Sequence, residues 1–86
     1  MTATARNRRV SASLTSVVLA NQDAGRQGLR IQNLSTAVLF LTVGGGTTEE
    51  SVRMPANAYY EEPFPGLKIT GRWASVNGWA VVTEIP

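Results

Sequence analysis

The acidic and hydroxyl side chains are the first residues in this chain that could do chemistry. Two carboxylate pairs, Glu49-Glu50 and Glu61-Glu62, have the residue type needed for general acid–base work. Neighbouring residues of an extended chain point to opposite faces, so neither pair shares a proton readily, and both are interpreted as solvated edges. The chain has no histidine, and Lys68 is its only lysine, so a Ser-Lys nucleophile is the remaining catalytic alternative. The sequence therefore predicts a protein that is not an enzyme.

Ligands for metals and phosphates are equally sparse. Without Cys or His, a metal site would have to use oxygen ligands alone, and no calcium-loop motif of alternating Asp and Asn is present. Gly44-Gly45-Gly46 is followed by Thr-Thr-Glu and not by Gly-Lys-Ser/Thr, so it does not match a phosphate-binding loop. We therefore expect neither a metal nor a cofactor.

Binding to another macromolecule is the remaining chemistry, and two groups of residues could provide it. Residues 1–9 are small, polar and basic, so they are predicted to form a flexible arm that adds a strand to a neighbour's sheet edge or lies in its groove. Two adjacent tyrosines in a short predicted strand lie on opposite faces of it. The candidate partner-binding residues are therefore Arg6, Arg8, Arg9, Val10, Tyr59 and Tyr60.

Nucleic acid and membranes are two possible classes of partner. The arginines of residues 1–30 could contact phosphates, and Tyr59, Tyr60, Trp73 and Trp79 could stack on bases. However, the net charge is only +2, and the basic residues precede the aromatic ones and do not interleave with them. The longest unbroken apolar run, residues 37–41, is far too short to cross a bilayer. We therefore expect neither partner.

Short segments of alternating polarity must position these residues. Residues 29–32 and 67–73 alternate between apolar and polar, which is typical of strands with one wet face. Residues 37–43 form the densest apolar run and predict a strand that is covered on both faces. No segment has sustained helical periodicity. The sequence therefore predicts an all-β fold, a small antiparallel β-sandwich or barrel of about six to eight short strands.

Two hairpins are predicted within this fold. Residues 29–43 read as two strands joined by a polar turn that begins at Asn33. Asn77-Gly78 predicts a closing hairpin with a type I′ turn, in which Trp73 faces Val82.

The length of the chain bounds its organisation. Its 86 residues suffice for one small domain, which we expect to span residues 10–86 after the arm of residues 1–9. Without disulfides, a domain of this size has oligomerisation or docking onto a larger body as its route to further burial. Basic residues concentrate before residue 31 and acidic residues after it, so copies of the chain could attract one another.

Several segments resemble small virion proteins of tailed bacteriophages. Residues 18–21, 28–33 and 38–41 (VLAN, GLRIQN and VLFL) resemble a loop that leads into a Leu-x-Ile-Gln-Asn strand and then an apolar strand ending in glycine. Residues 53–61 are similar to the next element of those proteins, a strand that ends at a Pro-containing turn and resumes with an aromatic-acidic pair. Residues 71–75 and 81–84 resemble their closing hairpin. The resemblance implies an all-β domain bound to the shell of the major capsid protein.

Together, the resemblance and the lack of catalytic groups predict a capsid cement or decoration protein. It would bind the major capsid protein and other copies of itself on the virion surface, after assembly in the bacterial cytoplasm. One alternative is a neck, tail or head-fibre component. An alternative of another class is a host-surface or carbohydrate-binding module that uses Tyr59, Tyr60 and Trp79, and it requires two of these rings on one exposed face.

Overall fold

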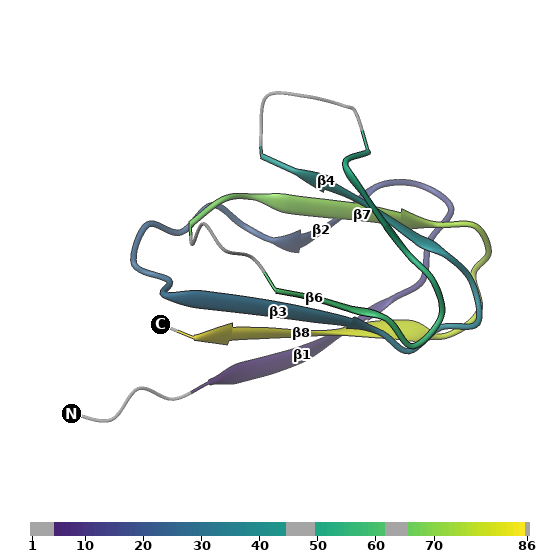
Figure 1. The fold of residues 1–86 in the computed structure, drawn as a ribbon, viewed down its shortest axis with the longest axis horizontal. Helices are drawn as coiled ribbons and strands as arrows, with labels where there is room; N and C mark the ends of the chain where they lie inside the picture. The colour runs from purple at the N-terminus through teal and green to yellow at the C-terminus, as the bar shows by residue number, and fades with distance from the viewer. Residues whose placement is uncertain (1–4, 45–49, 62–65, 86) are drawn as a thin grey trace.

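The chain folds into two four-stranded antiparallel sheets that pack face to face (Figure 1). This computed structural model describes residues 5–44, 50–61 and 66–85, and these residues form strands and no helix. The strand order is β1-β8-β3-β6 in sheet A and β2-β7-β4-β5 in sheet B. The predicted small all-β sandwich is therefore confirmed. The strands are β1 (Arg6–Ser11), β2 (Val17–Ala20), β3 (Gly28–Asn33), β4 (Leu39–Val43), β5 (Val52–Met54), β6 (Tyr59–Glu61), β7 (Ile69–Trp73) and β8 (Trp79–Ile85).

The chain changes sheet at nearly every connection. Among the described strands, β4 and β5 are the only consecutive ones that pair with each other. The hairpin predicted for residues 29–43 is therefore wrong, because β3 lies in sheet A and β4 in sheet B. Alternating polarity indicates which face of a strand is buried, but two strands can bury their apolar faces by opposing each other across a core as well as side by side.

The second predicted hairpin is wrong for a related reason. Trp73 pairs with Leu39 inside sheet B, whereas Val82 pairs with Ile31 inside sheet A. A type I′ turn needs positive φ at both central residues, and of Asn77 and Gly78 only the glycine has it, with φ of 106°. The connection therefore crosses the sandwich instead of turning back along the same sheet.

The hydrophobic core lies between the sheets and centres on the fully buried Trp73. Gly71 faces this core from β7, and a Cβ there would lie 2.9 Å from the Cδ1 atoms of both Leu19 and Leu39. The two leucines thus fill the space that glycine leaves. The other buried apolar residues are Ala12, Ala20, Leu29, Ile31, Leu41, Met54, Ile69, Ala80 and Val82.

The side chain of Asn33 is buried at the point where β3 leaves sheet A. Its Nδ2 donates hydrogen bonds to the carbonyl oxygens of Ala37, Met54 and Pro55, at 2.9, 3.1 and 3.2 Å. These three acceptors belong to the β3–β4 connection and to the end of β5 with the turn that follows it. One amide group therefore joins two segments that lead from one sheet to the other.

The Oδ1 atom of Asn33 accepts hydrogen bonds on its other side. Its donors are the hydroxyl and backbone N–H of Ser35, at 2.7 and 3.2 Å, and the indole Nε1–H of Trp73, at 3.3 Å. The central aromatic residue of the core is thus oriented by the same side chain that holds the crossing segments. Such a fully paired buried group is expensive to disturb, because its partners would be left without hydrogen bonds.

The first strand begins earlier than predicted. The arm expected over residues 1–9 is corrected from Arg6 onward, because Arg6–Ser11 pairs with β8 along its whole length. The physical reason is the edge of β8, which offers a backbone ladder that the composition of a basic segment does not reveal. Arg8 also donates a hydrogen bond from Nη2 to the carbonyl oxygen of Leu19, across to β2. The part of the predicted arm before residue 5 lies outside the described residues.

The variant Asn33→Asp tests how strongly this amide stabilises the sandwich. It keeps the shape but sets a carboxylate oxygen against carbonyl oxygens, so the pKa of the new Asp rises in the folded state above its unfolded value of about 3.9. Because the folded pKa is the raised one, the variant is most stable below the unfolded pKa and loses stability as pH rises through the folded pKa. A rise of about two pKa units corresponds to roughly 3 kcal/mol at neutral pH.

Urea denaturation of both proteins at pH values from about 3.5 to 7 measures this effect as a growing difference in the free energy of unfolding. A difference between native protein and variant that stays constant over that range would contradict the proposed role of Nδ2.

Candidate functional site

The outer side of sheet A carries the candidate site, because the strand register brings distant residues onto one face. Residues directly opposite each other in neighbouring strands point the same way. Leu29 and Ile31 of β3 are buried, so Arg30 and Gln32 and their cross-strand partners point outward. We call this surface the sheet A face, and it consists of Asn7, Arg9, Ser11, Arg30, Gln32, Tyr59, Glu61, Trp79, Val81 and Thr83.

Two arginines lie over aromatic rings on the sheet A face. The guanidinium carbon of Arg9 is 4.6 Å from the centre of the Trp79 ring, and that of Arg30 is 5.8 Å from the centre of the Tyr59 ring. Arg30 also forms an ion pair with Glu61, at 3.0 Å. The rings attract the cations and restrict their rotamers, so the guanidinium groups are held in place at the surface.

The rings themselves remain accessible. Tyr59 is 62% exposed and Trp79 is 36% exposed. They lie two strands apart and two residues along the sheet, which corresponds to about 12 Å from strand geometry. The face can therefore stack flat groups on two separate rings and donate hydrogen bonds from two guanidinium groups to carboxylates, phosphates or hydroxyls.

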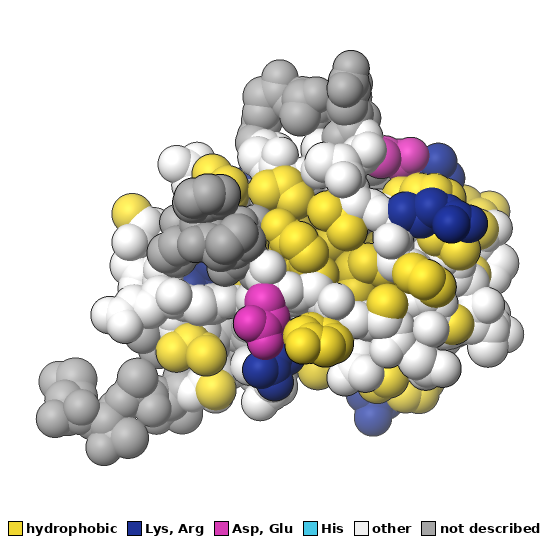
Figure 2. Space-filling model, viewed as in Figure 1, with side chains coloured by type: hydrophobic (Ala, Val, Ile, Leu, Met, Phe, Trp, Pro, Cys, Tyr) yellow, Lys and Arg dark blue, Asp and Glu magenta, His cyan; other side chains and the backbone are white. Residues whose placement is uncertain are grey.

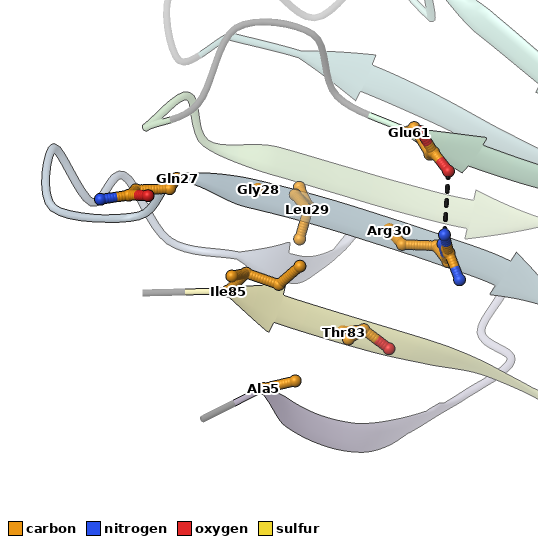
Figure 3. Close-up of a pocket in the computed structure, with 8 residues that line it drawn as sticks. All are labelled: Ala5, Gln27, Gly28, Leu29, Arg30, Glu61, Thr83 and Ile85. Carbon is orange, nitrogen blue, oxygen red and sulfur yellow. Dashed lines mark hydrogen bonds and ion pairs between the residues drawn. The ribbon is translucent and has the colours of Figure 1, made fainter. Parts of the chain in front are cut away.

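A cavity of 480 Å³ opens beside these residues, near the start of β3 and the end of β8 (Figure 3). Gly28 leaves space there, and the side chain of Ile85 lies beside it. The Arg30–Glu61 ion pair and the Thr83 hydroxyl provide polar groups at its border. The volume suits a small molecule, although the described lining offers few convergent polar groups to orient one.

The fold separates the six predicted partner-binding residues. Only Arg9 and Tyr59 lie on the sheet A face. Arg6 and Arg8 point toward the sheet B side, since they pair with Glu84 and Val82, and Arg6 lies 3.9 Å from a carboxylate oxygen of Asp23. Arg8 donates a hydrogen bond to the carbonyl oxygen of Leu19, and the Arg6 side chain remains 62% exposed.

The other two predicted residues pack against the core. Val10 pairs with the buried Ala80, and Tyr60 pairs with the buried Ile31, so both side chains point inward and are partly buried. As predicted, Tyr59 and Tyr60 lie on opposite faces of their strand.

Arg30, Gln32 and Glu61 were not among the predicted binding residues. A local signal for the first two existed, because they alternate with Leu29 and Ile31 and so belong to the wet face of β3. Arg9 lies in β1 and Trp79 in the neighbouring strand β8. The two residues are far apart in the sequence, so no local pattern links them.

Sheet B carries a comparable arginine on its outer side. The guanidinium carbon of Arg72 lies 4.6 Å from the centre of the Phe40 ring, and Arg72 forms an ion pair with Glu50. This ring-stacked arginine already has a carboxylate partner and no second ring-stacked neighbour among the residues described. It offers a matched control for changes on the sheet A face.

A buried arginine closes the end of the sandwich where β3 begins. The Arg26 side chain donates from Nη1 to the carbonyl oxygen of Asn21, at 2.9 Å, and from Nη2 to that of Leu67, at 2.7 Å. Its Nη1 also lies 3.7 Å from Oε2 of Glu84. Arg26 is 1% exposed, so it acts as a structural connector between three segments and not as a surface charge.

Metal ligands and membrane-spanning helices are two further classes of feature. Within residues 5–44, 50–61 and 66–85, no cluster of three or more His, Cys, Asp or Glu side chains could hold a metal ion. The same residues include no helix that is long and apolar enough to span a membrane. No known protein family, curated protein or solved structure matches this chain.

Replacing Arg26 and Arg30 by Met separates a buried arginine from an exposed one. Arg26→Met leaves two carbonyl oxygens and Glu84 without their cation, so we expect it to lower the free energy of unfolding by about 3 kcal/mol. Arg30→Met removes an ion pair between exposed side chains and should change stability by less than about 1 kcal/mol. Chemical denaturation of both variants checks this order, and equal effects would contradict the connector role of Arg26.

Proposed function

We propose that this chain is a non-enzymatic structural protein of a tailed-phage virion, and that it binds the major capsid protein through the sheet A face. It would act on the capsid surface as a cement or decoration protein, together with other copies of itself. The observation that carries the proposal is the pair of exposed rings, Tyr59 and Trp79, each held beside an arginine on one rigid sheet. The resemblance of several segments to small phage virion proteins supports the choice of partner.

The chemistry of the face suits protein–protein contact. Tyrosine, tryptophan and arginine are the residues that most often dominate binding energy at such interfaces. Here they project from paired strands, so little backbone ordering is needed when a partner docks. Binding would also stabilise the small domain by mass action, because a partner that recognises only the folded chain shifts the folding equilibrium.

This proposal differs from the predicted use of a basic arm. Arg6 and Arg8 point toward the sheet B side and contact Glu84 and the carbonyl oxygen of Leu19, and Arg6–Ser11 is a strand of sheet A. Arg9 remains part of the proposed contact, since its guanidinium group lies on the outer side of the sheet over Trp79. The contact to the capsid is therefore assigned to the face of the sheet.

The composition supports a role without catalysis. The chain has no His and no Cys, and Lys68 is its only Lys. On the sheet A face the one carboxylate, Glu61, forms an ion pair with Arg30 and is exposed to solvent.

The copy number of the chain in purified virions tests the proposal. A cement protein should be present in about hundreds of copies per particle, and a neck component in about a dozen, because of the symmetry of the two assemblies. Quantitative mass spectrometry of intact particles measures this number. Absence of the chain from the particles would contradict any virion role.

The variant Tyr59→Ala tests which surface is used. Because Tyr59 is 62% exposed, its loss should leave folding intact. The variant's retention, meaning the amount of protein that stays bound to purified phage heads, should fall at least about tenfold, as expected for an interface hot spot. Arg72→Ala makes a comparable change on the outer side of sheet B and should leave retention unchanged. Equal retention of both variants would exclude the sheet A face as the contact.

A carbohydrate-binding module is the second candidate function. It is favoured by the two exposed rings on one face, which is the arrangement that this reading required. Trp79 would report binding, because a sugar stacking on an exposed indole alters its fluorescence, whereas the buried Trp73 gives a constant background. Titration with neutral oligosaccharides should then produce a saturable change in tryptophan fluorescence, and the Tyr59→Ala variant should show weaker binding. A flat titration would remove this candidate.

A further inference from the structure

We propose that copies of this chain join edge to edge, with β1 of one copy pairing antiparallel to β6 of the next and Glu61 opposite Arg9 of that second copy. The inference rests on the homo-oligomer part of the proposed function and names the surface that copies would share. It does not depend on binding to the capsid.

The outer strands of sheet A are β1 and β6. In the order β1-β8-β3-β6, each outer strand has a neighbour on one side only, within the part of the chain that the structure describes. Every residue of β1 except Val10 is exposed, and so are Tyr59 and Glu61 of β6. Edge strands with unpaired backbone groups are templates for pairing with another chain.

The strand directions permit a continuous sheet. β1 runs antiparallel to β8, β8 to β3, and β3 to β6. A second copy in the same orientation therefore presents its β1 antiparallel to β6 of the first. The alternation of directions continues across the junction, and antiparallel ladders form their hydrogen bonds perpendicular to the strands.

One register gives all three residues of β6 a matching neighbour. If Glu61 faces Arg9 of the second copy, then Tyr60 faces Val10 and Tyr59 faces Ser11, because partner numbers run in opposite directions along an antiparallel pair. On the outer side this register pairs opposite charges. On the inner side it places Val10 beside Tyr60, both of which are partly buried and pack against the core.

The charge of Arg9 favours this register. Arg30 and Arg72 each lie over a ring and also bind a carboxylate. Arg9 lies over Trp79 but forms no ion pair with any residue that the structure describes. In the proposed junction, Glu61 would lie between Arg30 of its own chain and Arg9 of the next. The third ring-stacked arginine would thereby gain the same type of partner as the other two.

Hydrophobic side chains near the edge of β6 also favour a second copy of the chain as the partner there. Between the sheets, on the side where β5 and β6 are the edge strands, hydrophobic side chains reach the surface (Figure 2). Val52 of β5 and Tyr60 of β6 are only partly buried there. A strand added to the edge of β6 would place its inward residue, Val10, over this seam and remove apolar surface from water.

Pairing of β1 with β1 of another copy is less favourable than pairing of β1 with β6. Two copies of β1 that pair antiparallel with the same face outward would place Arg9 opposite Arg9 or Arg8 opposite Arg8 in the central registers, and like charges directly opposite destabilise a sheet. The junction is therefore heterologous, with a different strand from each copy. Heterologous contacts close into a ring or extend into an open filament, depending on the rotation between copies.

Charge reversal tests the junction in a way that a folding defect cannot imitate. Arg9→Glu would set a glutamate opposite Glu61 of the neighbouring copy, and Glu61→Arg would set an arginine opposite Arg9, so each variant alone should associate at least about tenfold more weakly than the native chain. An equimolar mixture of the two variants restores an opposite-charge junction at every contact and should recover association. Arg53→Glu, an exposed residue of β5 at the edge of sheet B, is the matched control and should associate like the native chain.

Sedimentation equilibrium at concentrations up to about 1 mM provides the measurement, since a junction of three paired residues is small and weak on its own. A native chain that stays monomeric over this range would overturn the proposal. So would a mixture of the two variants that associates no better than either alone, or an Arg53→Glu variant that loses association to the same degree. A monomeric chain that still binds virions would refute this junction but not the proposed function.

Disulfide trapping tests the register, because the native chain has no cysteine. Ser11→Cys and Tyr59→Cys, mixed as two single variants under mild oxidation, should form a heterodimer through directly opposite residues. Asn7→Cys replaces Ser11→Cys in the control mixture, and it lies four residues from the expected partner position. Equal yields from both mixtures would exclude the proposed register.

Discussion

The amide of Asn33 holds the connections that pass between the two sheets at one end of the sandwich. Its Nδ2 binds carbonyl oxygens of two crossing segments, and its Oδ1 accepts from Ser35 and from the indole of Trp73. A buried amide is favourable only when its donors and acceptors are paired, so these segments must come together for any of them to be stable. This requirement explains how short strands that change sheet at nearly every connection still reach one arrangement.

Arg26 has the corresponding role at the other end of β3. It joins the loops around Asn21 and Leu67 to Glu84 of β8 through a side chain that is almost fully buried. With both ends of β3 secured from inside, the outer side of sheet A contributes little to holding the sheets together. Arg9, Arg30, Tyr59 and their neighbours are therefore available for contacts with other molecules.

The proposed capsid contact and the proposed junction between copies use different parts of sheet A. The contact uses the flat outer side, where Tyr59 and Trp79 project. The junction uses the backbone edges of β1 and β6, with Glu61 and Arg9 at the border of the two surfaces. A continuous sheet would present several copies of the face at once, and linked sites bind a repetitive surface more strongly than single ones.

Much of the fold class could be predicted, whereas little of the site could. Alternation in residues 29–32 and 67–73 indicated strands, and buried Leu29, Ile31, Ile69 and Trp73 follow from it. The arginine-rich start was predicted to be an arm, because its composition resembles that of disordered segments, yet it pairs with β8. The arginines of residues 1–30 precede the aromatic residues along the chain, but the two kinds meet in space, where Arg9 lies over Trp79 and Arg30 lies near Tyr59.

The sequence by itself determined that this protein is a small all-β domain, and it determined which side of most strands faces the core, because both properties depend on local polarity with a period of two residues. Only the tertiary structure decided which strands share a sheet, that Asn33 and Arg26 are internal connectors, and that the sheet A face exists. These features depend on pairing between residues far apart in the chain, where many registers satisfy the same local pattern and the packing of the core selects one.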